Sequence, residues 1–224
     1  MVQYSQDVLR QLRQAMVIFT IGKADKTIGW GSGFACFPDR RAIFTCAHNF
    51  TGALPEYVIA RHASSDVRCG VPNVVFSKDL DCAIAILERP LVAEPLQWAD
   101  TLDEGDAIAI PDYVQGTPED RFSVAWKGVL ADIWLEGRST NTITKSALWV
   151  GSPDRTRDTR VFDVPGIHPG LSGSPMINVA GAVVGQAVQT LDRVSFSTIE
   201  SHLLEEMRAD AAKMYSEAKA KGYV

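Results

Sequence analysis

The sequence predicts an all-β protein of two six-stranded antiparallel β-barrels, with a short N-terminal helix and a C-terminal α-helix. Most of the chain consists of short apolar runs that Gly, Pro, Asp and Asn interrupt. Such runs are typical of the strands of sandwiches and barrels. Apolar residues recur at helical spacing near the two ends of the chain, which indicates a helix at each end.

The first expected element is a helix over residues 5–14, followed by a buried strand. Val8, Leu9 and Leu12 share one side of this helix. The apolar run over 15–22 also has the length of a secretory leader's apolar region.

Two features argue against a leader: Asp7 lies in the would-be basic region, and the sequence after Lys23 offers no small-x-small cleavage site. We therefore expect a cytoplasmic protein, with secretion as the alternative.

Twelve short runs rich in Val, Ile, Phe, Trp and Ala are candidate strands, and twelve strands suit two barrels of six. They are residues 15–21, 30–37, 42–46, 56–61, 82–87, 107–110, 122–131, 147–150, 161–164, 175–178, 181–188 and 193–197. The stretch 88–106, with two prolines and several acids, is interpreted as the connection between the barrels. We accordingly expect the first barrel within 1–95 and the second within 96–198.

The last expected element is an amphipathic helix within 199–224. Its apolar residues are spaced by three and four: Leu203, Met207, Ala211, Met214 and Ala218. Ser197 and Glu200 are a candidate capping box at its start. We expect this helix to pack on the second barrel, with partner binding as the alternative.

The composition is that of a soluble globular protein, with 46% hydrophobic and 22% charged residues among 224. A net charge of −5 argues mildly against a nucleic-acid partner, and no apolar run approaches the roughly 18 residues of a membrane helix. The four cysteines show no metal-ligand spacing, so we expect reduced, mostly buried thiols and no metal or cofactor. They are Cys36, Cys46, Cys69 and Cys82.

The segment around Ser172 carries the most chemical information. Glycines flank this serine, which is typical of a tight turn where backbone N–H groups converge. The N–H groups of Gly170 and Ser172 are candidates for an oxyanion hole. A serine hydroxyl needs a base, normally histidine, and an isolated Gly–Ser motif is more often only a loop.

His48 and Asp81 supply the missing partners. His48 follows a buried strand, and Asp81 opens another. Each alone has an ordinary structural interpretation, but the order His, Asp, Ser favours a catalytic triad. An α/β-hydrolase would run Ser, acid, His on a GxSxG elbow, and Ser174 stands where that elbow needs glycine.

Four segments in combination resemble the chymotrypsin-fold serine proteases: Gly31–Phe34, Thr45–His48, Asp81–Leu87 and Gly170–Pro175. The likeness is closer to the bacterial branch of high-temperature-requirement proteases and staphylococcal-type glutamyl endopeptidases, and it covers roughly residues 15–198. It implies a trypsin-like serine endopeptidase that acts on peptides or proteins, without a cofactor. The implied triad is His48, Asp81 and Ser172.

The resemblance also implies two walls for the pocket that holds the residue before the scissile bond. Ile167 and His168 precede the serine, and Ala187, Val188 and Gln189 follow it. Neither wall carries an aspartate for Lys or Arg, and Ala187 stands where glutamyl endopeptidases have a histidine. We expect cleavage after small or medium apolar residues.

Two alternatives stay open. One is a catalytically inactive, trypsin-like module that binds peptides. The other is a serine esterase that uses His202, a residue expected on the solvated surface early in the terminal helix. Regulation by a protein partner is also left open.

Overall fold

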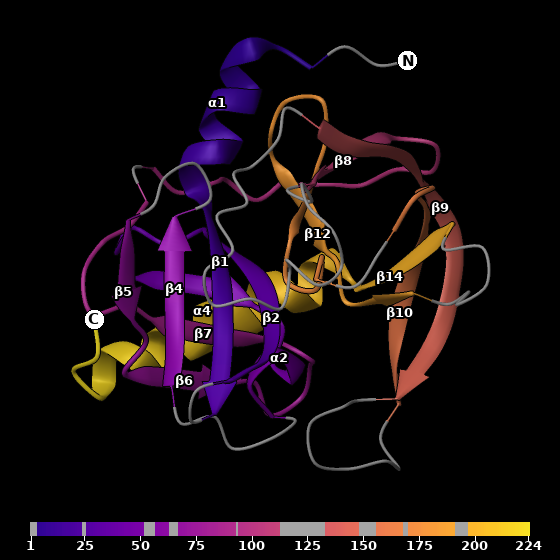
Figure 1. Ribbon diagram of the computed structural model, residues 1–224. Helices are drawn as coiled ribbons and strands as arrows, with labels where there is room; N and C mark the ends of the chain where they lie inside the picture. Colours follow the sequence, from indigo (N-terminus) through magenta and orange to yellow (C-terminus); the bar gives the residue numbers. More distant parts are fainter. Residues whose placement is uncertain are drawn as a thin grey trace.

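Two antiparallel sheets, with a helix near each end of the chain, make up the computed structural model (Figure 1). It describes residues 4–23, 26–51, 57–62, 67–92, 94–112, 133–147, 156–167, 170–190 and 197–224. The all-β fold class with two terminal helices is thereby confirmed. The expected strand over 122–131 lies outside the described residues, as do all but Ser197 of 193–197 and all but Ala147 of 147–150.

The first sheet has the strand order β5-β4-β1-β2-β3-β7-β6. Its strands are β1 (Met16–Lys23), β2 (Lys26–Ala35), β3 (Ala42–Thr45), β4 (Tyr57–His62), β5 (Arg68–Gly70), β6 (Asn73–Phe76) and β7 (Ala83–Ile86). The run that resembled a leader is β1, which pairs with β2 and β4 and buries Phe19 completely. Burial of an unbroken apolar run on both faces explains its composition.

The second sheet has the order β12-β11-β8-β9-β10-β14-β13. Its strands are β8 (Ala107–Asp112), β9 (Ile133–Ala147), β10 (Thr156–Asp163), β11 (Pro175–Ile177), β12 (Val183–Gln186), β13 (Gln189–Thr190) and β14 (Thr198–His202). Among the described residues each sheet has seven strands, whereas six were predicted for each barrel. The difference arises in part because short strands such as β5 and β6 were not predicted. The long strand β9 was also missed, since its residues are mostly polar and lack an apolar alternation.

The N-terminal helix α1 (Gln6–Ala15) confirms its prediction. The Ser5 hydroxyl accepts a hydrogen bond from the Val8 N–H and so caps the helix. Leu9, Leu12 and Ala15 are buried against the first sheet's core.

The C-terminal helix α4 (Leu204–Ala220) begins five residues later than the first position of the predicted segment, 199. The capping box was wrong, because Glu200 lies buried in β14 and accepts hydrogen bonds from the Thr144 and Thr159 hydroxyls. Those bonds stabilise a carboxylate inside the protein, where it cannot cap a helix.

The expected packing of α4 on the second barrel is found only in part, because the helix also packs on the first sheet. Met207, Ala211, Met214 and Ala218 share one apolar cluster with Ile84 and Ile86 of β7 and Val183 of β12. Figure 1 shows α4 crossing behind the first sheet toward the C-terminus. The helix therefore contacts strands of both sheets. None of the described helices is both long and apolar enough to span a membrane.

Candidate active site

The Asp81 carboxylate contacts both the imidazole ring and the backbone of His48. Nδ1 of His48 lies 2.5 Å from one carboxylate oxygen of Asp81, and the backbone N–H of His48 donates to the other at 2.9 Å. The carboxylate is almost fully buried, whereas a quarter of the imidazole is exposed. A carboxylate held this way fixes the ring orientation and leaves Nε2 facing outward for chemistry.

Strand pairing brings these residues together. Thr45 at the end of β3 pairs with Ala83 at the start of β7, so the segments just beyond them meet. His48 begins the short helix α2 (His48–Thr51). Asp79, the neighbouring acid, does not contact the imidazole, since its carboxylate pairs with Arg157 at 3.0 Å.

The loop of Ser172 is a tight turn between two glycines with positive φ, Gly170 at 100° and Gly173 at 92°. Two bonds to the second sheet fix its exit: Gly173 N–H donates to the Ala187 carbonyl, and Ala187 N–H donates to the Ser174 carbonyl. A Cβ on Gly173 would lie 1.9 Å from the Ser32 carbonyl oxygen, so only glycine fits.

The serine loop is also bonded to the first sheet through two residues whose role sequence reasoning missed. The carbonyl oxygen of Ser172 accepts from the Ser32 N–H at 2.9 Å and from the Asn49 side-chain amide at 3.1 Å. The Ser32 hydroxyl donates to the Gly170 carbonyl at 2.9 Å. The signal was present in the motif: a Cβ on Gly31 would lie 2.4 Å from Asn49 Cγ, which explains the glycine there.

The Ser172 hydroxyl itself donates to the Val188 carbonyl, over a long 3.4 Å. Within the described residues it makes no hydrogen bond to His48. The structure thus joins His48 with Asp81 directly, and joins Ser172 to them through Asn49 and the loop bonds. Catalytic hydrogen bonds are often long or misaligned before substrate binds.

The predicted oxyanion and pocket residues lie on either side of this loop. The N–H groups of Gly170 and Ser172 donate no backbone hydrogen bond within the described chain. Ile167 and Ala187 are buried in the second sheet's apolar cluster, and Val188 is 7% exposed. Gln189 begins β13, while His168 lies outside the described residues.

His202 is not the solvated helix residue that was expected. It ends β14, is 3% exposed, and its Nε2 accepts a 3.0 Å hydrogen bond from the Asp81 N–H. The prediction failed because the chain is still in strand β14 at this position, paired with Thr159 of β10, and helix α4 begins only at Leu204. An imidazole committed to the backbone of Asp81 does not serve Ser172 as a base, which removes the His202-dependent esterase interpretation.

The thiols were predicted to be reduced and mostly buried, and this is confirmed: all four cysteines are free, and three are buried. The sulfur of Cys46, a ring nitrogen of His48 and a carboxylate oxygen of Asp81 lie within 4.8 Å of one another. Zinc accepts such donors only with the thiol deprotonated. The Cys46 thiol instead donates to the Ala187 carbonyl, and burial, followed by the nearby Asp81, raises its pKa well above the ordinary value.

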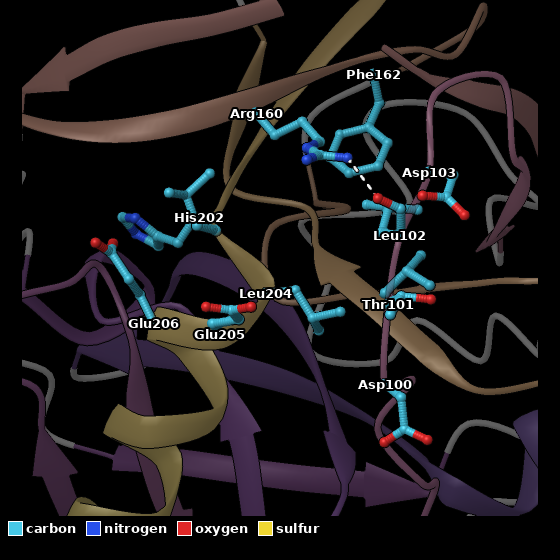
Figure 2. Close-up of a pocket in the computed structure, with 12 residues that line it drawn as sticks. Asp100, Thr101, Leu102, Asp103, Arg160, Phe162, His202, Leu204, Glu205 and Glu206 are labelled. Atoms are coloured by element: carbon cyan, nitrogen blue, oxygen red, sulfur yellow. Dashed lines mark hydrogen bonds between the residues drawn. The ribbon is translucent and has the colours of Figure 1, made fainter. Parts of the chain in front are cut away.

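A separate cavity of about 470 Å³ has His202 in its lining (Figure 2). The loop Asp100–Asp103, Arg160 and Phe162 of β10, and the start of α4 line it. Its lining includes none of the predicted pocket residues. His202 is its connection to the site, because that residue both lines the cavity and contacts Asp81.

Two antiparallel sheets, with a His–carboxylate pair beside a glycine-flanked serine loop, are the features of a serine hydrolase of chymotrypsin-like fold. The sequence model of the trypsin-like peptidase domain matches residues 31–185, more than half of the chain. The chain belongs to the trypsin-like peptidase domain family.

Solved structures agree on the fold. The crystal structure of the inactive form of Rv3671c protease has a TM-score of 0.68 at 19% identity, covering 93% of this chain and 92% of that one. The active form from M. tuberculosis has a TM-score of 0.71 at 20% identity, covering 92% and 83%. Among curated proteins no sequence matches the chain.

Proposed function

We propose that the protein is a serine endopeptidase, which hydrolyses peptide bonds of peptides or proteins through an acyl-enzyme. The observation that carries the proposal is the double contact of Asp81 with the ring and the backbone of His48. This contact places the proton of the neutral ring on Nδ1 and leaves Nε2 as the basic nitrogen. Membership of the trypsin-like peptidase family supports the same reaction class.

In the proposed first step, the Ser172 hydroxyl leaves the Val188 carbonyl and turns toward Nε2 of His48. Its oxygen attacks the substrate carbonyl carbon while Nε2 takes the proton, and Asp81 stabilises the resulting imidazolium. The imidazolium then gives that proton to the leaving amine as the C–N bond breaks. Water, deprotonated by His48 in turn, attacks the acyl-enzyme and releases the acid and the free serine.

In this proposal, the N–H groups of Gly170 and Ser172 donate hydrogen bonds to the negatively charged oxygen of each tetrahedral intermediate. Both groups donate no backbone bond within the described chain. The loop bonds to Ser32 and Asn49 fix them before substrate arrives, and preorganised donors contribute more than donors that must be reoriented.

The finer assignments follow the resemblance. We place the enzyme in the bacterial high-temperature-requirement and glutamyl endopeptidase branch, with a specificity pocket between Ile167 and the Ala187–Gln189 strand. The described side chains there, Ile167, Ala187 and Val188, are apolar, which favours small or medium apolar residues before the scissile bond.

Covalent labelling tests this function. A fluorophosphonate reacts only with an activated serine, so the wild-type protein should be labelled and Ser172→Ala should not. Ser216→Ala, which removes an exposed serine on α4, is the matched control and should label as wild type does. Paired peptide and ester substrates then distinguish a peptidase from an esterase. Binding of peptide without labelling would instead identify an inactive peptide-binding module.

A further inference from the structure

His202 lies where the two sheets meet, behind the predicted acid. It is the last residue of β14 and pairs with Thr159 of β10 in the second sheet. Asp81 belongs to the loop between β6 and β7 of the first sheet. A side chain from one sheet thus bonds to the backbone of the other.

The direction of this bond is unambiguous. A backbone N–H can only donate, so Nε2 of His202 must be unprotonated and the ring proton lies on Nδ1. Burial lowers the pKa of His202 from 6.5 to about 4, which keeps the ring neutral and accepting at neutral pH. Nδ1 has no hydrogen-bond partner in the described structure.

The bond completes the fixation of Asp81. The Asp81 carboxylate accepts hydrogen bonds from His48. Within the described residues, the Asp81 carbonyl accepts one backbone hydrogen bond, a long one of 3.4 Å from the Ala47 N–H. Within the described chain, the N–H of Asp81 donates to His202 and to no other acceptor. Without that acceptor, the backbone that carries the catalytic carboxylate would lose its strongest tether and leave a buried donor unsatisfied.

We propose that His202 is a positioning residue for the triad: from the second sheet it holds the Asp81 backbone, so that the carboxylate stays in line with His48. The role rests on the proposed function. In this role His202 takes no part in proton transfer, since its ring makes no hydrogen bond to Ser172 or Gly170 within the described residues. Figure 2 shows His202 among the residues that line the cavity, and the same ring bonds to the backbone of Asp81.

Two substitutions separate positioning from packing. His202→Leu keeps a buried side chain but removes the acceptor. His202→Gln places an amide oxygen near the position of Nε2 and can still accept from Asp81. We expect the leucine variant to lose about 10- to 100-fold in kcat, the range that small misplacements of catalytic groups cost, with KM within twofold. The glutamine variant should recover most of this loss.

A purely structural role predicts a different set of results. It would lower the Tm of His202→Leu without changing kcat. It would also leave unchanged the acid limb of the pH profile of kcat/KM, and this limb reports the protonation of the base, His48. A shift of that limb in His202→Leu, restored in His202→Gln, is therefore expected. A folded leucine variant with wild-type kcat and an unshifted profile overturns the proposal.

A measurement on the wild-type protein covers the case in which His202→Leu does not fold. An N–H···N hydrogen bond transmits a scalar coupling between the two nitrogens, here the Asp81 amide and His202 Nε2. Detection of this coupling in the wild-type protein, together with slow exchange of the Asp81 amide that stays slow in His202→Gln, is expected; absence of the coupling overturns the proposal. If fluorophosphonate does not label the wild-type protein, the proposed function is overturned and the positioning role with it. If the wild type is active and His202→Leu is equally active, the positioning role alone is overturned.

Discussion

The side-chain amide of Asn49 donates a 3.1 Å hydrogen bond to the carbonyl oxygen of Ser172, a residue 123 positions further along the chain. Because Asn49 directly follows His48 in α2, this bond ties the predicted nucleophile to the predicted base through one short helix. The same amide donates to the Thr45 hydroxyl at 3.1 Å, which fixes its orientation.

Replacing Asn49 by alanine should slow fluorophosphonate labelling by about 10- to 100-fold, since the serine loop loses one of its three hydrogen bonds to Ser32 and Asn49. Asn49→Asp should be at least as damaging, because a carboxylate would face the Ser172 carbonyl. Asn141→Ala, which removes an exposed amide bonded to Glu104, is the control. Equal labelling rates in the three variants would contradict the tether.

The two neighbouring acids provide a matched pair. Asp81→Asn should fold normally and lose on the order of 10⁴ in kcat through the wrong histidine tautomer. Asp79→Asn removes two solvent-exposed ion pairs, with Arg157 at 3.0 Å and with Lys213 at 3.9 Å, and such pairs contribute roughly 0–1 kcal/mol each. Steady-state peptide hydrolysis checks both, and the reverse ranking would mean that the acid is assigned to the wrong residue.

Alanine substitutions at two glycines with positive φ, Gly173 and Gly105, distinguish the effect of backbone strain from that of a steric clash. Gly173→Ala should abolish labelling, because its Cβ would collide with the Ser32 carbonyl that lies 1.9 Å away. Gly105 has a similar φ of 80° and open space around its would-be Cβ, so Gly105→Ala should cost only about 1 kcal/mol of stability. Thermal unfolding and labelling of both variants test this; an active Gly173→Ala protein would mean the loop has room to move.

Stability should fall with acidification between pH 6.5 and 4 because of His202. Its pKa is about 4 in the folded protein against 6.5 for the free group, owing first to burial. The unfolded chain therefore takes up the proton first, and the free energy of unfolding drops by about 3 kcal/mol across this window, then levels off below it. Asp81 and Glu200 partly offset the burial, and Arg157 adds to it.

Urea unfolding of the wild type and of His202→Gln at several pH values measures this contribution. The glutamine variant should lose the part of the slope between pH 6.5 and 4 that belongs to His202. Superimposable stability profiles of the two proteins would show that His202 does not titrate in this window.

Specificity is tested with a peptide library. We expect graded cleavage after small or medium apolar residues, since one methylene in such a pocket is worth about 1–3 kcal/mol. Ala187→Leu should shift the preference toward smaller residues. Strong selection of Arg, Lys or Glu would overturn the pocket assignment and leave the triad untouched.

The elements that the sequence predicted well are those whose signal is local. An apolar run such as β1 and the helical spacing of Met207, Ala211 and Met214 follow from burial of apolar surface alone. The pairing of His48 with Asp81 was also predictable, because each residue adjoins a recognisable buried strand.

The misses have a common physical cause, which is burial of polar side chains by distant partners. In β14, Glu200, Ser201 and His202 are all at most 3% exposed, so no apolar alternation marks the strand. Likewise Asn49 and Ser32 acquire their roles only from the Ser172 loop. Spacing in the sequence does not reveal such contacts.

The bonds from Ser32 and Asn49 to the Ser172 carbonyl have a consequence for how the protein comes into being. The base and acid come from the first sheet and the nucleophile from the second, so neither sheet contains a working centre by itself. On the ribosome, the proposed chemistry cannot begin until the strands that hold the Ser172 loop have emerged, so a nascent chain that contains only the first sheet is inactive. During refolding, the first moment at which the serine can be acylated marks the docking of one sheet on the other.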